Sequence, residues 1–376
     1  MYFDFATWAR ILRLILREPF RLRRALFLWA VFVGLSLLSM VNMVCLALDR
    51  VLFPGYRDTP VKAPIFVVGN GRSGTTHIQR ILSADGERFS FFKTWELLLP
   101  SIVQHRVLDL LAATDRRVLG GFVERRFRQS EDRALEDIRK LHDWQSTGSE
   151  EDDFVMYANW SSVSLTWPFP YAELEYLFFT DREPPAKRRR ILGFYRSMLQ
   201  RLLYCRGGNR IHCGKSPQFT LKMRSILEVF PDARFIVMLR HPFETIPSLL
   251  DVMSQYWRGM GASDELVEAS AELLGEVQIA QYRHALEVVD GLPESQQVVV
   301  EFRDLLDDQK KVLEDIYTRF GLEVSQEFDR FLEEEREAAK TFRSQHEFEA
   351  EGQGPARERV RHELGDLFER FDWSLE

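Results

Sequence analysis

Residues 64–82 read PIFVVGNGRSGTTHIQRIL and contain the strongest structural signal in the chain. The wholly apolar run from Ile65 to Val68 is typical of a strand buried on both faces of a parallel sheet. A glycine-rich turn follows, and apolar residues at helical spacing then predict a helix that packs on the sheet. Backbone amides at the start of such a helix bind a phosphate-type oxyanion. The residues expected to form this site are Gly69, Gly71, Arg72, Ser73, Gly74, Thr75 and Thr76.

The loop resembles the P-loop of nucleotide-triphosphate enzymes, G-x-x-x-x-G-K-[ST], but it lacks the lysine. Gly69 and Gly74 have the required spacing, whereas Thr75 occupies the lysine position and Arg72 places a cation inside the loop. Kinases and ATPases use that lysine to reach the terminal phosphates. The loop therefore predicts phosphate binding and disfavours ATP chemistry, and a P-loop nucleotide kinase stays open as an alternative.

Two further apolar runs, 235–239 and 298–300, are followed by turn residues or a helical pattern in the same way. Recurring strand, loop and helix units predict an α/β fold, a P-loop-like parallel sheet flanked by helices, with ligands at the carboxyl ends of its strands. The proline-rich segment 49–64 indicates a linker. We expect an amino-terminal hydrophobic helical anchor with its linker over residues 1–60 and one globular domain over residues 61–376.

The composition is that of a globular protein. The chain has 376 residues, 45% hydrophobic and 28% charged, which excludes disorder and a polytopic membrane protein. Its formal net charge of −7 argues against a nucleic-acid partner, since such proteins carry a surplus of lysine and arginine. Cys45, Cys205 and Cys213 show neither a disulfide framework nor zinc spacing, so we expect structural thiols and no bound metal.

The first fifty residues depart from this average. Residues 25–48 contain no charge and, as a helix rising about 1.5 Å per residue, are long enough for a hydrocarbon core of about 30 Å. Six arginines and two acids precede them, interleaved with apolar residues as in a basic amphipathic helix at a membrane surface. We expect residues 25–48 to associate with a membrane; a re-entrant hairpin, a monotopic helix and a buried helix of a soluble protein stay open.

With these motifs the chain resembles the sulfotransferases that use 3′-phosphoadenosine 5′-phosphosulfate (PAPS), specifically their bacterial and tyrosylprotein-sulfotransferase-like branch. PIFVVGNGRSGTT is similar to the family's 5′-phosphosulfate loop, with Asn70-Gly71 where a proline is common. The family's 3′-phosphate segment, a strand followed by an arginine and eight residues later by a serine, matches Arg240 and Ser248. A second anion pocket suits PAPS, which carries an extra ribose phosphate, better than ATP. The resemblance covers about residues 64–320 and implies PAPS as the sulfuryl donor.

The resemblance also implies catalytic residues. Lys215 begins a Lys-Ser-Pro sequence that looks like the family's K-[SD]-P element, whose lysine helps to hold the transferred group. Arg72 and Lys215 are therefore expected to stabilise charge on the leaving phosphate. Glu96 lies where tyrosylprotein-like members place a catalytic glutamate, and His77 is the alternative base. We expect no catalytic role for the acidic segment 150–153, because most acidic clusters are merely solvated.

The predicted function is PAPS-dependent transfer of a sulfuryl group to a hydroxyl or amine. The acceptor is a small molecule or a lipid, whose pocket is expected between about residues 94 and 204, a stretch that includes Trp144, Trp160 and Trp167. The arginine bias points the domain out of the cell, whereas a bacterium makes its sulfuryl donor in the cytosol, so a bacterial enzyme is expected on the cytoplasmic face of the membrane. A catalytically silent, membrane-tethered nucleotide-binding module stays open, and so does the oligomeric state.

Overall fold

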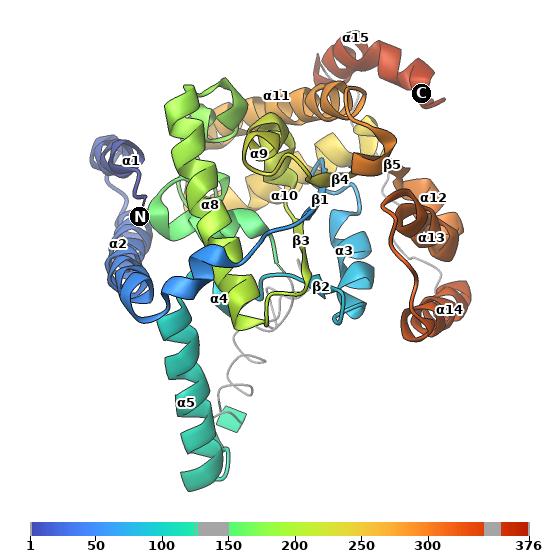
Figure 1. The fold of residues 1–376 in the computed structure, drawn as a ribbon. Coiled ribbons are helices and arrows are strands. Elements are labelled where there is room, and N and C mark those ends of the chain that lie inside the picture. The colour runs from blue at the N-terminus through green and yellow to red at the C-terminus, as the bar shows by residue number, and fades with distance from the viewer. Residues whose placement is uncertain (1, 124, 127–149, 342–354, 375–376) are drawn as a thin grey trace.

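A computed structural model describes residues 2–123, 125–126, 150–341 and 355–374 of the chain. At its centre these residues form a five-stranded parallel sheet in the order β2-β3-β1-β4-β5 (Figure 1). The strands are β1 Ile65–Gly69, β2 Phe89–Ser90, β3 Ile211–Lys215, β4 Arg234–Leu239 and β5 Gln297–Glu301. The predicted α/β class and three predicted strands are confirmed.

Helices surround the sheet on both faces (Figure 1). The α-helices are α1 Phe5–Arg17, α2 Leu22–Leu52, α3 Thr75–Ala84, α4 Thr94–Leu98, α5 Ile102–Val118, α8 Pro185–Cys205, α9 Met223–Val229, α10 Pro242–Gly259, α11 Asp264–Val289, α12 Phe302–Asp307, α13 Gln309–Arg319, α14 Gln326–Thr341 and α15 Pro355–Arg370. Short 3-10 helices are η1 Pro54–Asp58, η2 Asp152–Asn159, η3 Val163–Thr166, η4 Ala172–Leu177, η5 Thr180–Arg182, η6 Pro217–Lys222 and η7 Glu294–Gln296.

Strand β1 is apolar throughout because its side chains pack alternately on two covered faces. Phe66 and Val68 belong to a buried cluster with residues of α8, α9 and α11. Ile65 and Val67 belong to another, with residues of α3 and α13. All four side chains are fully buried. The predicted helix after the loop is α3, and its apolar face is buried against the sheet as expected.

The loop after β1 lies where the direction of strand order changes. The chain leaves β1 for β2 and β3 on one side of it and later crosses to β4 and β5 on the other. Parallel sheets bind ligands at the carboxyl end of the strand where the order reverses. Gly69 ends β1 with φ of 132°, and a Cβ there would lie 2.3 Å from the carbonyl oxygen of Met238 on β4. Close contact between β1 and β4 therefore requires glycine at this position.

The amino-terminal helices pack on the rest of the chain. Helix α2 meets, by length and composition, the criterion for a membrane-spanning helix, yet Leu28 and Phe32 of α2 share a buried cluster with Trp160 and Trp257. It runs to Leu52, past the start of the expected linker, because the face that carries Asp49 is buried. The division of the chain near residue 60 stays a prediction.

Candidate functional site

The loop between β1 and α3 closes into a tight turn. The amide and Oγ of Ser73 both donate to the carbonyl of Asn70, at 3.3 and 2.7 Å. Arg72 and Gly74 have φ of 68° and 91°, in the left-handed region. For an arginine that conformation costs about 1–3 kcal/mol, and such strain gathers at ligand sites. Helix α3 begins at Thr75. The first backbone amides of a helix have no carbonyl partner within it, so they are available to bind a ligand.

The residues predicted for the two ends of PAPS meet at one edge of the sheet. Nε of Arg72 donates to Oγ of Ser248 at 3.3 Å, and Nη1 of Arg240 donates to the carbonyl oxygen of Arg72 at 3.4 Å. Arg240 directly follows β4, and Ser248 lies near the start of α10. The Arg240 side chain is one-third exposed and pairs with Glu244 at 2.6 Å. Arginines from two separate motifs thus meet at one edge of the sheet.

Phe302 forms part of the same edge. It is the first residue after β5, and its ring centroid lies 4.8 Å from the guanidinium carbon of Arg240. A Cβ on Gly74 would lie 2.3 Å from Cδ2 of the same ring, so only glycine fits between the ring and the loop. Phe302 was not predicted, because nothing in the sequence after β5 indicates that its side chain lies against the loop after β1 and Arg240 after β4.

Lys215 reaches the start of α3 from the end of β3. Its Nζ lies 3.3 Å from Oγ1 of Thr76 and 3.2 Å from Oε1 of Glu151, and the side chain is 1% exposed. The other carboxylate oxygen of Glu151 accepts from Nε2 of Gln218 at 2.7 Å. A buried cation and a carboxylate therefore stand side by side next to the loop, as a site for charge stabilisation and proton transfer requires.

The acidic segment 150–153 is buried, so its interpretation as a solvated cluster is wrong. Asp152 accepts from Nε2 of His212 at 2.6 Å, and Asp153 pairs with Nζ of Lys222 at 2.6 Å. The side chains of these two aspartates, His212 and Lys222 are at most 1% exposed. Sequence patterns missed the role because these partners follow 60 and 69 residues later. The two pairs anchor the segment and hold the neighbouring glutamate beside the buried lysine.

Strand β3 escaped sequence analysis for the same reason. Its sequence, Ile-His-Cys-Gly-Lys, contains a histidine, a lysine and a glycine, unlike the apolar runs that predict buried strands. His212 and Lys215 are nevertheless buried, because Asp152 and Glu151 pair with them. The glycine is required too, since a Cβ on Gly214 would lie 2.2 Å from Oδ2 of Asp152.

Glu96 and His77, the two predicted bases, are engaged elsewhere. Nη2 of Arg206 donates to both carboxylate oxygens of Glu96, at 2.9 and 2.8 Å, and the amide of Lys93 donates to Oε2 at 2.7 Å. His77 lies 3.0 Å from Oε1 of Gln309, and burial lowers its pKa. No hydrogen bond or ion pair described for either residue reaches the lysine at the loop. The catalytic role of Glu96 stays a prediction.

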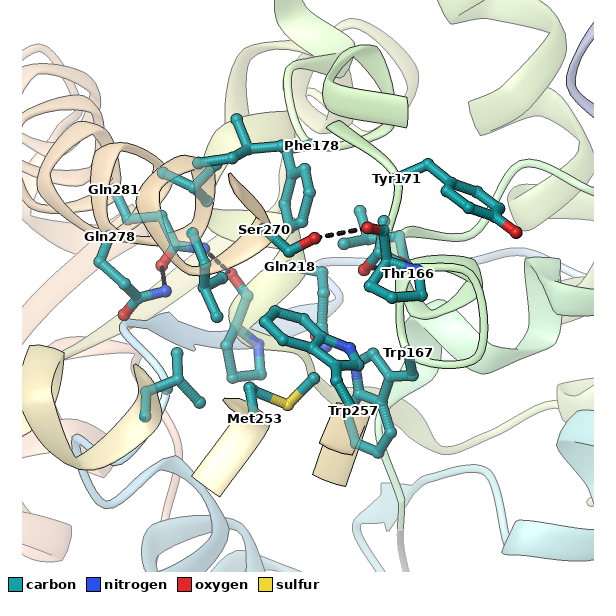
Figure 2. A pocket seen from close by; sticks show the side chains of 18 of the residues that line it. Thr166, Trp167, Tyr171, Phe178, Gln218, Met253, Trp257, Ser270, Gln278 and Gln281 are labelled. Atoms are coloured by element: carbon teal, nitrogen blue, oxygen red, sulfur yellow. Dashed lines mark hydrogen bonds between the residues drawn. The ribbon is translucent and has the colours of Figure 1, made fainter. Parts of the chain in front are cut away.

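A largely apolar pocket opens beside these groups. Its walls come from the stretch 163–178 and from α10 and α11, and its polar end includes Gly71, Glu151 and Gln218. Figure 2 shows Trp167, Trp257 and Met253 among the lining side chains, with Gln278 and Gln281 on the other side of the pocket.

The expected acceptor region supplies only part of that pocket. Trp167 lines it, but Trp160 is a fully buried core residue and Trp144 lies outside the described residues. The contributions of α10 and α11 went unpredicted, because a pocket-lining face and a core face have the same apolar pattern.

The cysteines are thiols, buried at Cys213 and half-buried at Cys45 and Cys205. Cys45, Cys205 and Cys213 are free. Burial raises the pKa of Cys213 and raises that of Cys205 to about 11, so both stay protonated near neutral pH. In the described residues, no group of three or more histidine, cysteine or acidic side chains is arranged to hold a metal ion.

Comparison with known proteins gives sulfotransferases throughout. The family model described as "Sulfotransferase family" matches residues 64–326. The chain is 27% identical over 326 residues to the omega-hydroxy-beta-dihydromenaquinone-9 sulfotransferase Stf3 of Mycobacterium bovis, which covers 85% of this chain and 77% of that protein. The same enzyme of Mycobacterium tuberculosis matches equally well.

Solved structures show that the fold is shared. Sulfotransferase STF9 from Mycobacterium avium has a TM-score of 0.74 and 18% identity, covering 100% of this chain and 93% of that chain. Sulfotransferase STF1 from Mycobacterium tuberculosis H37Rv has a TM-score of 0.67 and 17% identity, covering 96% and 92%. Because the family model matches more than half of its length, this chain belongs to the sulfotransferase family and is an enzyme that transfers sulfuryl groups.

Proposed function

We propose that the enzyme takes its sulfuryl group from PAPS, bound between the loop after β1 and the start of α10. The observation that carries this proposal is the contact of Arg72 with both Ser248 and Arg240, which joins two anion-binding motifs at one edge. The donor set fits an adenosine with phosphates on both its 5′ and 3′ sides. Forked guanidinium donors and a hydroxyl suit the 3′ phosphate, and helix amides suit the 5′ phosphosulfate.

Bound PAPS supplies an activated sulfuryl group on its 5′ phosphate. Ser73, Gly74, Thr75 and Thr76 hold that phosphosulfate through amides and hydroxyls, and Arg240 and Ser248 hold the 3′ phosphate. Arg72 and Lys215 face the negative charge that grows on the leaving phosphate. A preorganised donor of this kind contributes about 100- to 1,000-fold to turnover. The proposed chemistry uses these fixed cations rather than a metal.

A carboxylate takes the proton of the acceptor, and the contacts favour Glu151 over Glu96. Glu151 lines the pocket and lies 3.2 Å from Lys215. A general base has to stand within hydrogen-bond reach of the proton that it takes from the acceptor. Both oxygens of each carboxylate accept hydrogen bonds, but the partners of Glu151 are Lys215 and Gln218 beside the pocket. Arg206 holds both oxygens of Glu96, which is not among the residues that line the pocket.

The acceptor that the pocket fits best is a hydroxyl on an apolar, lipid-like molecule. Apolar side chains, tryptophan, methionine, leucine, valine, phenylalanine and proline among them, line most of the pocket, and Glu151 and Gln218 line it together with Gly71 of the loop. Such an arrangement buries an apolar body and presents a polar end to the transfer site. By its name, the Stf3 relative acts on a hydroxylated menaquinone derivative. We further propose that the chain associates with a membrane through residues 25–48, on the cytoplasmic face of a bacterial cell.

Calorimetry tests the donor. Adenosine 3′,5′-bisphosphate should bind the protein, and Arg240→Ala should weaken that binding at least tenfold, since a charge-assisted hydrogen bond is worth about 1.5–3 kcal/mol. Stronger binding of ADP with Mg²⁺ would overturn the donor and revive the kinase alternative. Transfer of labelled sulfate from PAPS to a long-chain primary alcohol, and not to the corresponding amine, tests the acceptor class.

A further inference from the structure

Helix α2 carries a buried carboxylate deep in the protein. Asp49 is fully buried and accepts from Nε of Arg201 on α8 at 2.7 Å. It also accepts from Oγ of Ser101 at 2.8 Å and from the amides of Ile102 and Val103 at 3.1 and 2.9 Å. Asp49 thereby caps helix α5 and neutralises a buried arginine, which ties the end of α2 to two other helices.

Further polar contacts continue along the same face of α2. Asn42 accepts from Nε2 of Gln104 at 2.7 Å and donates to the carbonyl of Leu98 at 2.9 Å. Oγ of Ser39 accepts from Nε1 of Trp160 at 3.1 Å. These side chains form a specific, satisfied interface with the body of the protein, and replacing it with lipid would remove the hydrogen bonds of Asn42 and Asp49 to other helices and loops.

This interface argues against α2 as a membrane-spanning helix. A bilayer crossing would place Asp49 in or near the apolar layer, which costs about 2.5–3.5 kcal/mol at the centre of a helix. It would also leave Arg201 buried without its partner, a loss of about 3–5 kcal/mol. The likeness to sulfotransferase STF9 extends over 100% of this chain, so α2 belongs to the shared fold.

The opposite face of α2 is exposed and wholly apolar. Its large side chains recur at every third or fourth position, and each is 40–77% exposed. We call this face the α2 stripe; it consists of Leu22, Leu26, Trp29, Val33, Leu37, Met40, Val41, Val44, Leu48, Val51 and Leu52. At about 1.5 Å per residue it runs for roughly 45 Å. A soluble monomer rarely leaves so long an apolar surface in water.

The position of the stripe and its flanking charges indicate what covers it. In Figure 1, α1 and α2 lie at the outer side of the molecule, with α5 projecting beyond them. Exposed arginines flank both ends of the stripe: Arg17, Arg21 and Arg23 at its start, and Arg50 at its end. The chain as a whole is acidic, at −7. Basic charge concentrated around an apolar stripe complements anionic lipid headgroups. A second copy packed in either direction would bring like charges together.

We propose that the α2 stripe lies in the plane of an anionic membrane surface, inserted into one leaflet, with its flanking arginines at the headgroups. This inference rests on the membrane association proposed above and specifies its geometry; it does not depend on the identity of donor or acceptor. It also shortens the path of a lipid acceptor. Met253 and Trp257 line the pocket and share a buried cluster with Phe32 and Leu35 of α2.

The experiment measures co-sedimentation of the full chain with phosphatidylcholine vesicles, with and without phosphatidylglycerol. The wild type should bind the anionic vesicles. Leu37→Glu combined with Val44→Glu should lower the binding constant at least about tenfold, a loss of 1.4 kcal/mol. Leu306→Glu is the matched control, since Leu306 on α12 is 61% exposed and Leu37 is 57% exposed. It should bind as the wild type does. Arg17→Gln with Arg21→Gln should reduce the preference for anionic lipid.

Three outcomes would overturn the proposal. The first is unchanged vesicle binding by the double glutamate variant. The second is protease access to the amino terminus and to the globular part from opposite sides of sealed vesicles, which a spanning helix produces and an in-plane helix does not. The third is conversion of a dimer to a monomer by Leu37→Glu with vesicle binding intact, which would assign the stripe to a second copy. An unchanged circular dichroism spectrum and urea midpoint show that a variant is folded, which keeps this test independent of that of the donor.

Discussion

Two acidic regions lie close to the sheet, and the structure uses them differently. In the turn 93–98, the carboxylate of Glu96 accepts hydrogen bonds from Arg206 and from a backbone amide, so it completes local structure. In the segment 150–153, two aspartates are locked into the core, and Glu151 is left between Lys215 and the pocket. The comparison teaches that the partners of a carboxylate, which come from distant parts of the chain, decide whether it is available for chemistry.

Glu151→Gln is the variant that breaks this comparison most directly. The amide keeps the size of the side chain but cannot take a proton, so turnover should fall about 100- to 10,000-fold. Binding of adenosine 3′,5′-bisphosphate should change little, because the nucleotide contacts lie elsewhere. Steady-state sulfate transfer and calorimetry on the same preparation measure both effects. Turnover near that of the wild type would return the role of base to Glu96.

Lys215→Ala removes the cation beside Glu151. We expect turnover to drop about 100- to 1,000-fold, since a preorganised positive charge at the leaving phosphate is lost. Lys187→Ala is the control: Lys187 pairs with Glu183 on the surface at 2.9 Å and should leave transfer unchanged. Equal activity of the two variants in single-turnover assays would contradict the assignment of Lys215.

Glu96→Gln tests whether Glu96 stabilises the fold or takes part in catalysis. Arg206 would keep a neutral partner instead of a carboxylate, so the free energy of unfolding should fall by roughly 1–3 kcal/mol. Turnover per folded molecule should stay close to that of the wild type. Urea denaturation and active-site titration separate stability from catalysis. A fall in turnover without a fall in stability would show that Glu96 is the base.

Ser248→Ala should have the smallest effect. It removes one hydroxyl from the nucleotide edge, and a neutral hydrogen bond contributes about 0.5–1.5 kcal/mol. Binding of adenosine 3′,5′-bisphosphate should weaken several-fold, with turnover at saturating PAPS unchanged. Binding of adenosine 5′-phosphate, which lacks the 3′ phosphate, is the control and should not respond. An equal loss for both nucleotides would place Ser248 away from the 3′ phosphate.

The sequence was sufficient for strands β1, β4 and β5 and for the loop and helix that follow β1. Residues 65–82 predict strand, loop and helix because their periodicity and glycines are local, and Arg240 follows an equally clear strand. The family resemblance then implied sulfuryl transfer, which the family model and the relatives confirm.

Long-range pairing explains what the sequence did not reveal. The acidic segment 150–153 looked solvated because its lysine and histidine partners lie far away in the chain. The apolar run 25–48 predicted a membrane segment from composition alone, but its buried polar face depends on Arg201 and Gln104. Local sequence patterns predict individual helices and strands. Which buried charges are paired depends on how those helices and strands pack together, and a local pattern does not contain that information.

Phe302 packs against Gly74, the residue before α3, and its ring also lies beside the guanidinium of Arg240. One ring therefore sets the spacing between the groups that are to hold opposite ends of the adenosine. A smaller side chain at position 302 would change the distance between the loop and Arg240. The affinities for the 5′ and the 3′ phosphate should therefore fall by similar factors. The distance between the loop and Arg240 therefore depends on the size of an aromatic side chain that itself makes no hydrogen bond to the nucleotide.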